Sequence, residues 1–318
     1  MKRIILFAIA IIGLNYCFAQ TDPQSTLALQ VVVEDVVEPF PTAAKAQMQS
    51  KLSNILTKNG LQSCNWQNQF FITATVVPQT KDILPGPPTQ IAEVMDVVFY
   101  IGDSYNEIVF SSTNQTVKGV GTTDAKCYLN AISNIKTSST KLAEFIEEGK
   151  KKIVDYYNAQ APKMLLKAQS LCDMQTYDEA IWLLMTIPSE CTYYEQALAQ
   201  GVAIYKEMLK NQCHQNLAAA KNAWMANYNQ DGALEAAEYL TLITPESGCY
   251  EEAKELYNEI KSRMREDYDF EIRKYEDELK KHEDEVLLQK ELINAMREVG
   301  VAFGENQKAN ETNIGFVK

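Results

Sequence analysis

Strand-type patterns of hydrophobic and polar positions fill the first part of the chain. Residues 27–35 (LALQVVVED) are rich in β-branched side chains and stop in acidic residues before Pro39, which predicts a strand. Three more runs of this type cover 70–80, 93–103 and 107–119. The letters LPGPP follow the first of these runs, and DSYNE separates the other two, as expected for a stiff turn and a hairpin.

Helical spacing appears twice within this first part. One helix is predicted over 43–60 and ends at Asn59-Gly60, a C-terminal stop. A second begins near Asp124. The side chains expected to face inward are Ala43, Ala46, Met48, Leu52, Ile55 and Leu56 in the first helix, and Ala125, Tyr128, Leu129, Ile132 and Ile135 in the second. The order β-α-β-β-β-α, with mostly antiparallel strands, predicts an α+β domain over 20–140 whose helices cover one face of the sheet. It resembles the small α+β modules of outer-membrane assembly and secretion accessory proteins.

From residue 141 onward the pattern is helical. A connecting helix carries Leu142, Phe145, Ile146, Ile153 and Tyr157 on one side and is expected to close at Ala161-Pro162. Helical repeats then extend to 264, a long charged helix with a heptad seam occupies 265–303, and a polar, flexible tail occupies 304–318.

The repeats are visible as a near-duplication with a shift of 56 residues. Residues 177–197 (YDEAIWLLMTIPSECTYYEQA) align with 233–253 (ALEAAEYLTLITPESGCYEEA) at small and apolar positions of helical spacing. Each unit is expected to contain a nested helix pair and a third helix, over 192–210 in the first unit and from 249 in the second.

Small residues in the first unit resemble those of the tetratricopeptide repeat. Ala168 stands where two paired helices would touch, Ala180 follows in the second helix, and Leu184 lies one turn further on. The period of 56, Trp224 at the position equivalent to Ala168, and the early Pro188 depart from that family's pattern. The overall layout also resembles uncharacterised exported proteins of Bacteroidetes-type bacteria, and this resemblance implies a compartment and an architecture but no activity.

A heptad seam marks the end of the chain. Its apolar positions are Ile272, Leu279, Val286 and Ile293, and their companion positions are Tyr268, Tyr275, His282, Gln289 and Met296. The stretch without glycine or proline extends to Gly300, and the apolar stripe is expected to dock on the chain's own repeats or on another protein, which makes the chain a monomer. A coiled-coil dimer is the alternative.

The N-terminus has the order of a secretory signal: Lys2 and Arg3 precede an apolar run from Ile4 to Leu14. That run is about half the length that spans a bilayer. Cleavage after Ala19 gives a periplasmic or secreted protein with no transmembrane helix. A lipoprotein anchored through Cys17 is the alternative, disfavoured by the bulky Tyr16.

The charge balance and the cysteine count limit the kinds of partner and the compartment that are expected. Acidic residues outnumber basic ones by 42 to 30, so duplex nucleic acid is not an expected partner. Six cysteines remain after cleavage at Ala19, and an exported chain can pair them. They are Cys64, Cys127, Cys172, Cys191, Cys213 and Cys249. A bridge from Cys213 to Cys172 or Cys249 is geometrically easiest if the helices alternate in direction, and Cys64 could pair with Cys127.

Two segments leave a binding role open. Gly119 and Gly121 lie between a strand and a helix, where backbone N–H groups can hold an anion, but the third glycine of a dinucleotide fingerprint is missing. We therefore expect a bend that uses glycine dihedral angles. LPGPP at 84–88 could be a proline-rich recognition segment, and a stiff turn is the preferred interpretation.

No catalytic set stands out in the sequence. The two histidines, His214 and His282, lie 68 residues apart, and the acidic runs Glu147-Glu148 and Glu283-Asp284-Glu285 lie in charged helical stretches. We expect no enzyme, no cofactor and no metal, and a scaffold that binds a protein or peptide in the cell envelope. The alternative is an envelope hydrolase or small-ligand carrier with a site in the cleft between the domains.

Overall fold

The computed structural model describes residues 27–33, 42–64, 68–264 and 289–306. The predicted signal peptide, three of the four apolar seam residues, His282 and most of the predicted tail lie outside these residues. What is described is an α+β part followed by a helical part, as the sequence predicts.

A five-stranded sheet forms the first part. Its strands are β1 (Ala28–Val32), β2 (Gln62–Cys64), β3 (Phe70–Leu84), β4 (Gln90–Asp103) and β5 (Ile108–Gly121), in the spatial order β2-β1-β3-β4-β5. The pairs β3·β4 and β4·β5 are antiparallel, and β1 is parallel to both of its neighbours. The sequence analysis missed β2, because a strand of three residues shows no alternation and is defined by its pairing with β1.

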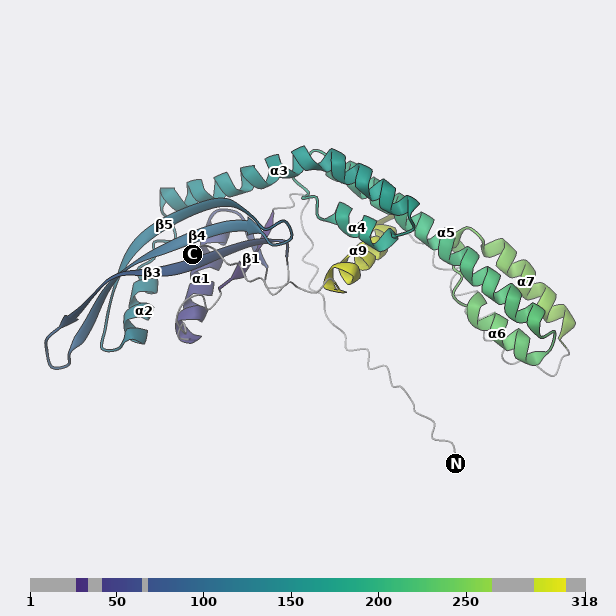
Figure 1. The fold of residues 1–318 in the computed structure, drawn as a ribbon, viewed down its shortest axis with the longest axis horizontal. Coiled ribbons are helices and arrows are strands. Elements are labelled where there is room, and N and C mark those ends of the chain that lie inside the picture. Colours follow the sequence, from purple (N-terminus) through teal and green to yellow (C-terminus); the bar gives the residue numbers. More distant parts are fainter. Residues whose placement is uncertain (1–26, 34–41, 65–67, 265–288, 307–318) are drawn as a thin grey trace, which may run out of the picture.

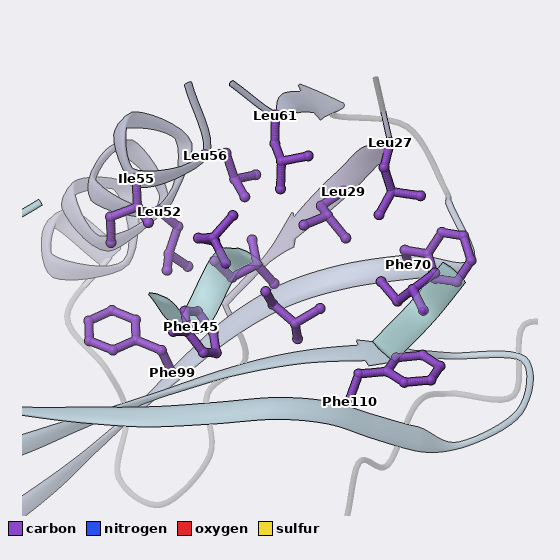
Figure 2. Packing of buried hydrophobic residues seen from close by; sticks show 14 of the residues in the cluster. Leu27, Leu29, Leu52, Ile55, Leu56, Leu61, Phe70, Phe99, Phe110 and Phe145 are labelled. Carbon is purple, nitrogen blue, oxygen red and sulfur yellow. The ribbon is translucent and has the colours of Figure 1, made fainter. Parts of the chain in front are cut away.

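Three helices cover one face of this sheet. Two were predicted, α1 (Thr42–Lys58) and α2 (Asp124–Ser133); the third is the first half of α3 (Thr140–Asp173), which the sequence analysis assigned to the helical part. On β4, Met95, Val97, Phe99 and Ile101 are fully buried, whereas the residues between them are partly exposed. Figure 2 shows leucines of α1 and the β1 region converging with phenylalanines of the sheet and α3. Alternation along the strands thus places one face against the helices.

In two helices, alanines that were predicted to face the core are exposed, and neighbouring small residues are buried instead. In α1, Ala44 is buried and Ala43 and Ala46 are exposed. In α2, Cys127 and Ala131 are buried and Ala125 is exposed. Alanine carries little apolar area, so it does not determine which side of a helix meets the sheet.

Helix α3 does not end at Pro162, contrary to the prediction. It runs on to Asp173, with Ala161, Leu165 and Ala168 buried on both sides of the proline. Proline in a helix interior removes one hydrogen bond and costs about 3 kcal/mol. Packing on both sides of Pro162 offsets that cost, so α3 joins the sheet to the repeats without a break.

The two repeat units share one helix. The first contains the end of α3, α4 (Tyr177–Met185) and the start of α5 (Tyr194–Ala226); the second contains the end of α5, α6 (Gln230–Leu240), the short 3-10 helix η1 (Pro245–Ser247) and α7 (Tyr250–Arg263). The predicted break near residue 210 is wrong: the third helix of one unit is the first helix of the next. Ala168, Ala180 and Leu184 are buried, and so is Trp224 at the equivalent of Ala168.

The two units belong to different hydrophobic cores. Buried residues of the first unit join the cluster that fills the sheet and its helices. Those of the second unit form a separate cluster, from Cys213 to Ile260. Figure 1 shows α5 leading away from the sheet to α6 and α7 at the far end of the molecule.

The last helix of the described chain returns to the first unit. Helix α9 (Gln289–Asn306) packs on α4 and α5 and is drawn beneath α4 in Figure 1. It ends at Asn306, three residues beyond the predicted end at 303. In the part of the chain that the structure describes, we find no helix with the length and hydropathy needed to span a membrane.

Candidate functional site

The sheet, the first repeat unit and α9 meet around Trp182 of α4. The Trp182 ring lies 5.3 Å from that of Tyr105, in the β4–β5 turn, and 6.0 Å from that of Phe303 in α9 (centroid distances). Nearby, Gln69 is buried and its Nε2 donates to the Thr186 carbonyl oxygen at 2.6 Å. These contacts join the α+β part directly to the helical part.

Three glycines lie where α9 packs most closely on α4 and α5. A Cβ atom built on Gly300 would lie 2.2 Å from Met185 Sδ, and one on Gly304 would lie 2.7 Å from Trp182 Nε1. On the α5 side, a Cβ on Gly201 would lie 2.6 Å from Met296 Sδ. The methionine side chains that face Gly300 and Gly201 are flexible and can move, whereas Gly304 faces the rigid Trp182 ring, so Gly304 is the position where a side chain would most clearly displace α9.

The other contacts of α9 are apolar on the inside and polar on the outside. Met296 is 2% exposed, and Val299 packs against the same core. At the rim, Arg297 Nη2 donates to the Tyr194 hydroxyl at 3.1 Å. The seam residue Ile293 is half-buried. We define the α9 groove as the surface of α4 and α5 formed by Ile181, Trp182, Met185, Tyr194 and Gly201.

A buried carboxylate holds α3 to the β4–β5 turn. Asp103 is fully buried and accepts hydrogen bonds from the backbone N–H groups of Tyr105 and Asn106, from Asn106 Nδ2, and from the Tyr157 hydroxyl at 2.5 Å. Burial, followed by the Asp103 charge, raises the pKa of Tyr157 well above its usual range. Sequence reasoning missed this cluster, although an aspartate opening a turn three residues before an asparagine was a usable signal.

The glycines before α2 are explained by close packing. A Cβ on Gly119 would lie 2.2 Å from the Cys127 carbonyl oxygen, and one on Gly121 would lie 2.4 Å from Cys127 N. Neither has positive φ; the glycines of the described chain that do are Gly60 and Gly248. The expected reason, a glycine dihedral angle, is therefore wrong: β5 approaches α2 too closely for any side chain.

The first turn of α2 is occupied by its own residues. The Thr123 hydroxyl accepts from Lys126 N at 3.3 Å, and Asp124 places a carboxylate in that turn. Lys81 Nζ lies 2.6 Å from Asp124 Oδ1 and 3.4 Å from Glu93 Oε1. The hydrogen bond with Asp124 is the main cause that raises the pKa of Lys81. An anion at the first turn of α2 would be repelled by the Asp124 carboxylate.

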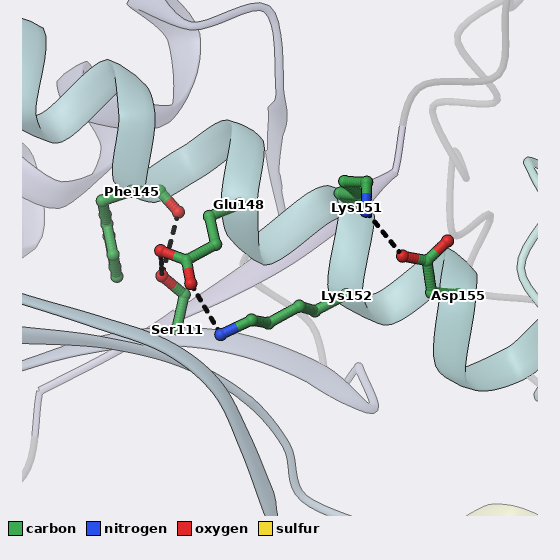
Figure 3. Close-up of polar contacts among 6 residues, drawn as sticks. All are labelled: Ser111, Phe145, Glu148, Lys151, Lys152 and Asp155. Carbon is green, nitrogen blue, oxygen red and sulfur yellow. Dashed lines mark hydrogen bonds and ion pairs between the residues drawn. The ribbon is translucent and has the colours of Figure 1, made fainter.

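The acidic run at Glu147-Glu148 forms ion pairs with lysines of the same helix, and Figure 3 shows the pair made by Glu148. Glu148 Oε1 lies 2.6 Å from Lys152 Nζ, and this hydrogen bond lowers the pKa of the Glu148 carboxyl. Ser111 of β5 donates to the Phe145 carbonyl oxygen at 3.2 Å and also faces Glu148. These residues attach α3 to β5, as an outer layer of the fold.

One of the predicted disulfide alternatives is present: Cys213 is bonded to Cys249, with a Cα–Cα distance of 6.0 Å. Cys127, Cys172 and Cys191 are free thiols. The predicted bridge from Cys64 to Cys127 is wrong. Cys64 lies on β2 at one edge of the sheet and Cys127 in the helix that packs on β5 at the other. Strands lie about 4.8 Å apart, so this separation far exceeds the roughly 6 Å that a disulfide allows.

The disulfide lies at a joint that both repeat units contain. In the first unit, the Asn158 side chain accepts from Thr192 N at 2.8 Å, and Cys191 Sγ donates to the Val154 carbonyl oxygen at 3.8 Å. In the second, the joint between α5 and the start of α7 is covalent, through Cys213 and Cys249. The neighbouring His214 is exposed. No group of three or more possible metal ligands occurs among the residues described.

The LPGPP segment is the turn between β3 and β4, and it is exposed throughout. Beyond residue 76 the side chains of β3 are exposed, with Ile83 71% exposed near the tip. The sheet therefore projects a hairpin into solvent, on the side away from α4 (Figure 1).

Comparison with known proteins gives no family. No protein-family model matches the chain, and a search of curated proteins finds no match. Among solved structures, the chain is similar to a minor lipoprotein from Acinetobacter baumannii, with 18% identity over 37% of this chain and 87% of that one, at a TM-score of 0.24. A superposition this poor does not define a common fold, so function is argued below from the chain's own residues.

Proposed function

We propose that this chain is an exported protein of the cell envelope that binds a protein or peptide through its helical units and performs no catalysis. The observation that carries this proposal is the second repeat unit, which has its own core and its own disulfide. The 33 residues of α5 correspond to about 50 Å of helix and carry this unit away from the sheet. Such an extended array presents large helical surfaces to a partner.

The contacts between the sheet and the first unit favour binding over a cleft-based activity. Gln69, Tyr105 and Asn106 of the α+β part contact Thr186, Trp182 and Tyr157 of the helical part directly. Side chains that could serve an interdomain site are thus engaged with each other. The second candidate, an envelope hydrolase or ligand carrier, would need these contacts to open.

Site-specific photo-crosslinking in the native envelope tests the proposal. A crosslinking amino acid would replace Leu166 on α3 or Leu242 after α6, which are 72% and 63% exposed. Ile83 at the hairpin tip, 71% exposed, is the matched control. We expect a discrete protein adduct at one or both helical positions. Adducts confined to Ile83, or retention of a small molecule with no protein adduct, would contradict the proposal.

A further inference from the structure

The α9 groove has the features of a helix-binding site. It combines an aromatic ring, a flexible methionine and a glycine on two antiparallel helices, and its occupant is a single helix lying across them. Recognition of one amphipathic helix by such a groove is a common mode of protein binding. Here the occupant belongs to the same chain.

Helix α9 is poorly suited to be helical by itself. Its last part reads VGVAFG from 299 to 304, with two glycines and two β-branched valines, which are weak helix formers. In proteins, most helical stability comes from the packing of an apolar face and not from intrinsic propensity. The groove therefore supplies the stability of α9, and leaving the groove and unfolding are one event.

The same glycines define what the groove accepts. Gly300 and Gly304 lie one turn apart and face α4: a side chain at Gly304 would meet the Trp182 ring, and one at Gly300 would have to displace Met185 and contact Ile181. Phe303 lies beside Trp182, and Met296 lies against Gly201. A competing ligand needs the same pattern: two glycines four residues apart, an aromatic residue beside them, and a long apolar residue one turn earlier.

We propose that the α9 groove is the binding site for a partner's amphipathic helix with this glycine pattern, and that α9 is a built-in competitor. The inference rests on the proposed function and names the site and its regulation. A tethered helix has an effective concentration of about 1 mM, so an α9 segment that itself binds the open groove with a Kd of about 10 µM weakens the binding of any partner about 100-fold. A partner gains access when its own concentration or additional contacts overcome the tether.

Peptide binding to the full chain tests this competition. The probe is a fluorescent peptide of residues 289–306, and binding is measured by anisotropy. In the opened variant, Gly300→Leu and Gly304→Leu change α9 and leave the groove intact. The control variant, Val301→Leu with Ala302→Leu, places the same two leucines on the exposed side of α9. We expect the opened variant to bind the peptide about 100-fold more tightly than the wild type or the control.

Two further measurements keep the test decisive. A peptide carrying both leucine substitutions should not bind the opened variant. In the wild type, hydrogen exchange should show α9 opening at lower free energy than α4, because its release is local. Equal peptide affinity for all three proteins, binding of the substituted peptide, or exchange of α9 only through global unfolding would overturn the inference.

The outcomes also separate this inference from the proposed function. If the groove does not exchange α9 but crosslinks form at Leu242, the scaffold function stands and the competitor role fails. If the peptide binds the opened variant but the envelope yields no protein adduct at Leu166 or Leu242, the groove is real and the scaffold function fails.

Discussion

Removing the Cys213–Cys249 disulfide is expected to loosen the second repeat unit alone. The bridge closes a loop with a sequence separation of 36 residues that contains the end of α5, all of α6, and η1. In the chain-entropy relation, a loop of this length corresponds to about 4 kcal/mol of stabilisation. A unit of about 50 residues has roughly 3–8 kcal/mol of stability in total. Replacing Cys213 and Cys249 by alanine therefore removes much of what holds this unit folded.

The two separate cores determine how the loss is distributed. Trp224, Leu240 and Tyr257 belong to the second core, and Phe99 and Met296 to the first. Hydrogen exchange measured by mass spectrometry should show faster exchange in α6 and α7 and unchanged protection in β3, β4 and α4.

The free thiol Cys172 provides the matched control. It is partly exposed on α3, and Cys172→Ala should leave exchange in both units close to that of the wild type. An equal loss of protection in the sheet would refute the reasoning, because it would show that the two cores unfold as one. Unchanged exchange in α6 and α7 would show that the bridge adds nothing to a unit already stable.

Three more predictions follow from the fold. Gly119→Ala should lower the free energy of unfolding in urea by about 1–3 kcal/mol, because its Cβ would lie 2.2 Å from a backbone carbonyl oxygen, whereas Gly86→Ala has space and should be neutral. Asp103→Ala should cost roughly 3 kcal/mol in the same assay by leaving the Tyr157 hydroxyl and two N–H groups without their acceptor; a loss below 1 kcal/mol would contradict this. Burial raises the pKa of the Cys191 thiol to about 11 from 9.0, so its stabilising contribution is complete below pH 9 and is lost as the pH rises through 11. Alkylation of this thiol at pH 8 should be far slower in the native chain than in urea, and equal rates would contradict the assigned burial.

Several features of this protein could be predicted from its sequence. Runs rich in β-branched and aromatic residues, bounded by turn signals, predicted β1, β3, β4 and β5, because such side chains pack well on a pleated sheet. The 56-residue duplication identified the repeats, since α4 and α6 bury equivalent residues such as Leu184 and Leu240. The spacing of cysteines at helix junctions left two partners for Cys213, and one of them, Cys249, is the observed partner.

Only the tertiary structure decided where helices continue and what they touch. Pro162 predicts a helix end, but packing on both sides of it outweighs a local cost of about 3 kcal/mol. A lone glycine such as Gly300 weakens a helix, yet α9 continues through it to Asn306 because the helix packs on α4 and α5. Helix propensities of different residues change the stability of a helix by up to about 1 kcal/mol per residue, whereas burial of one large apolar side chain stabilises the fold by about 2–3 kcal/mol. Contacts between segments as distant as α4 and α9 therefore decide the outcome, and a one-dimensional pattern does not contain them.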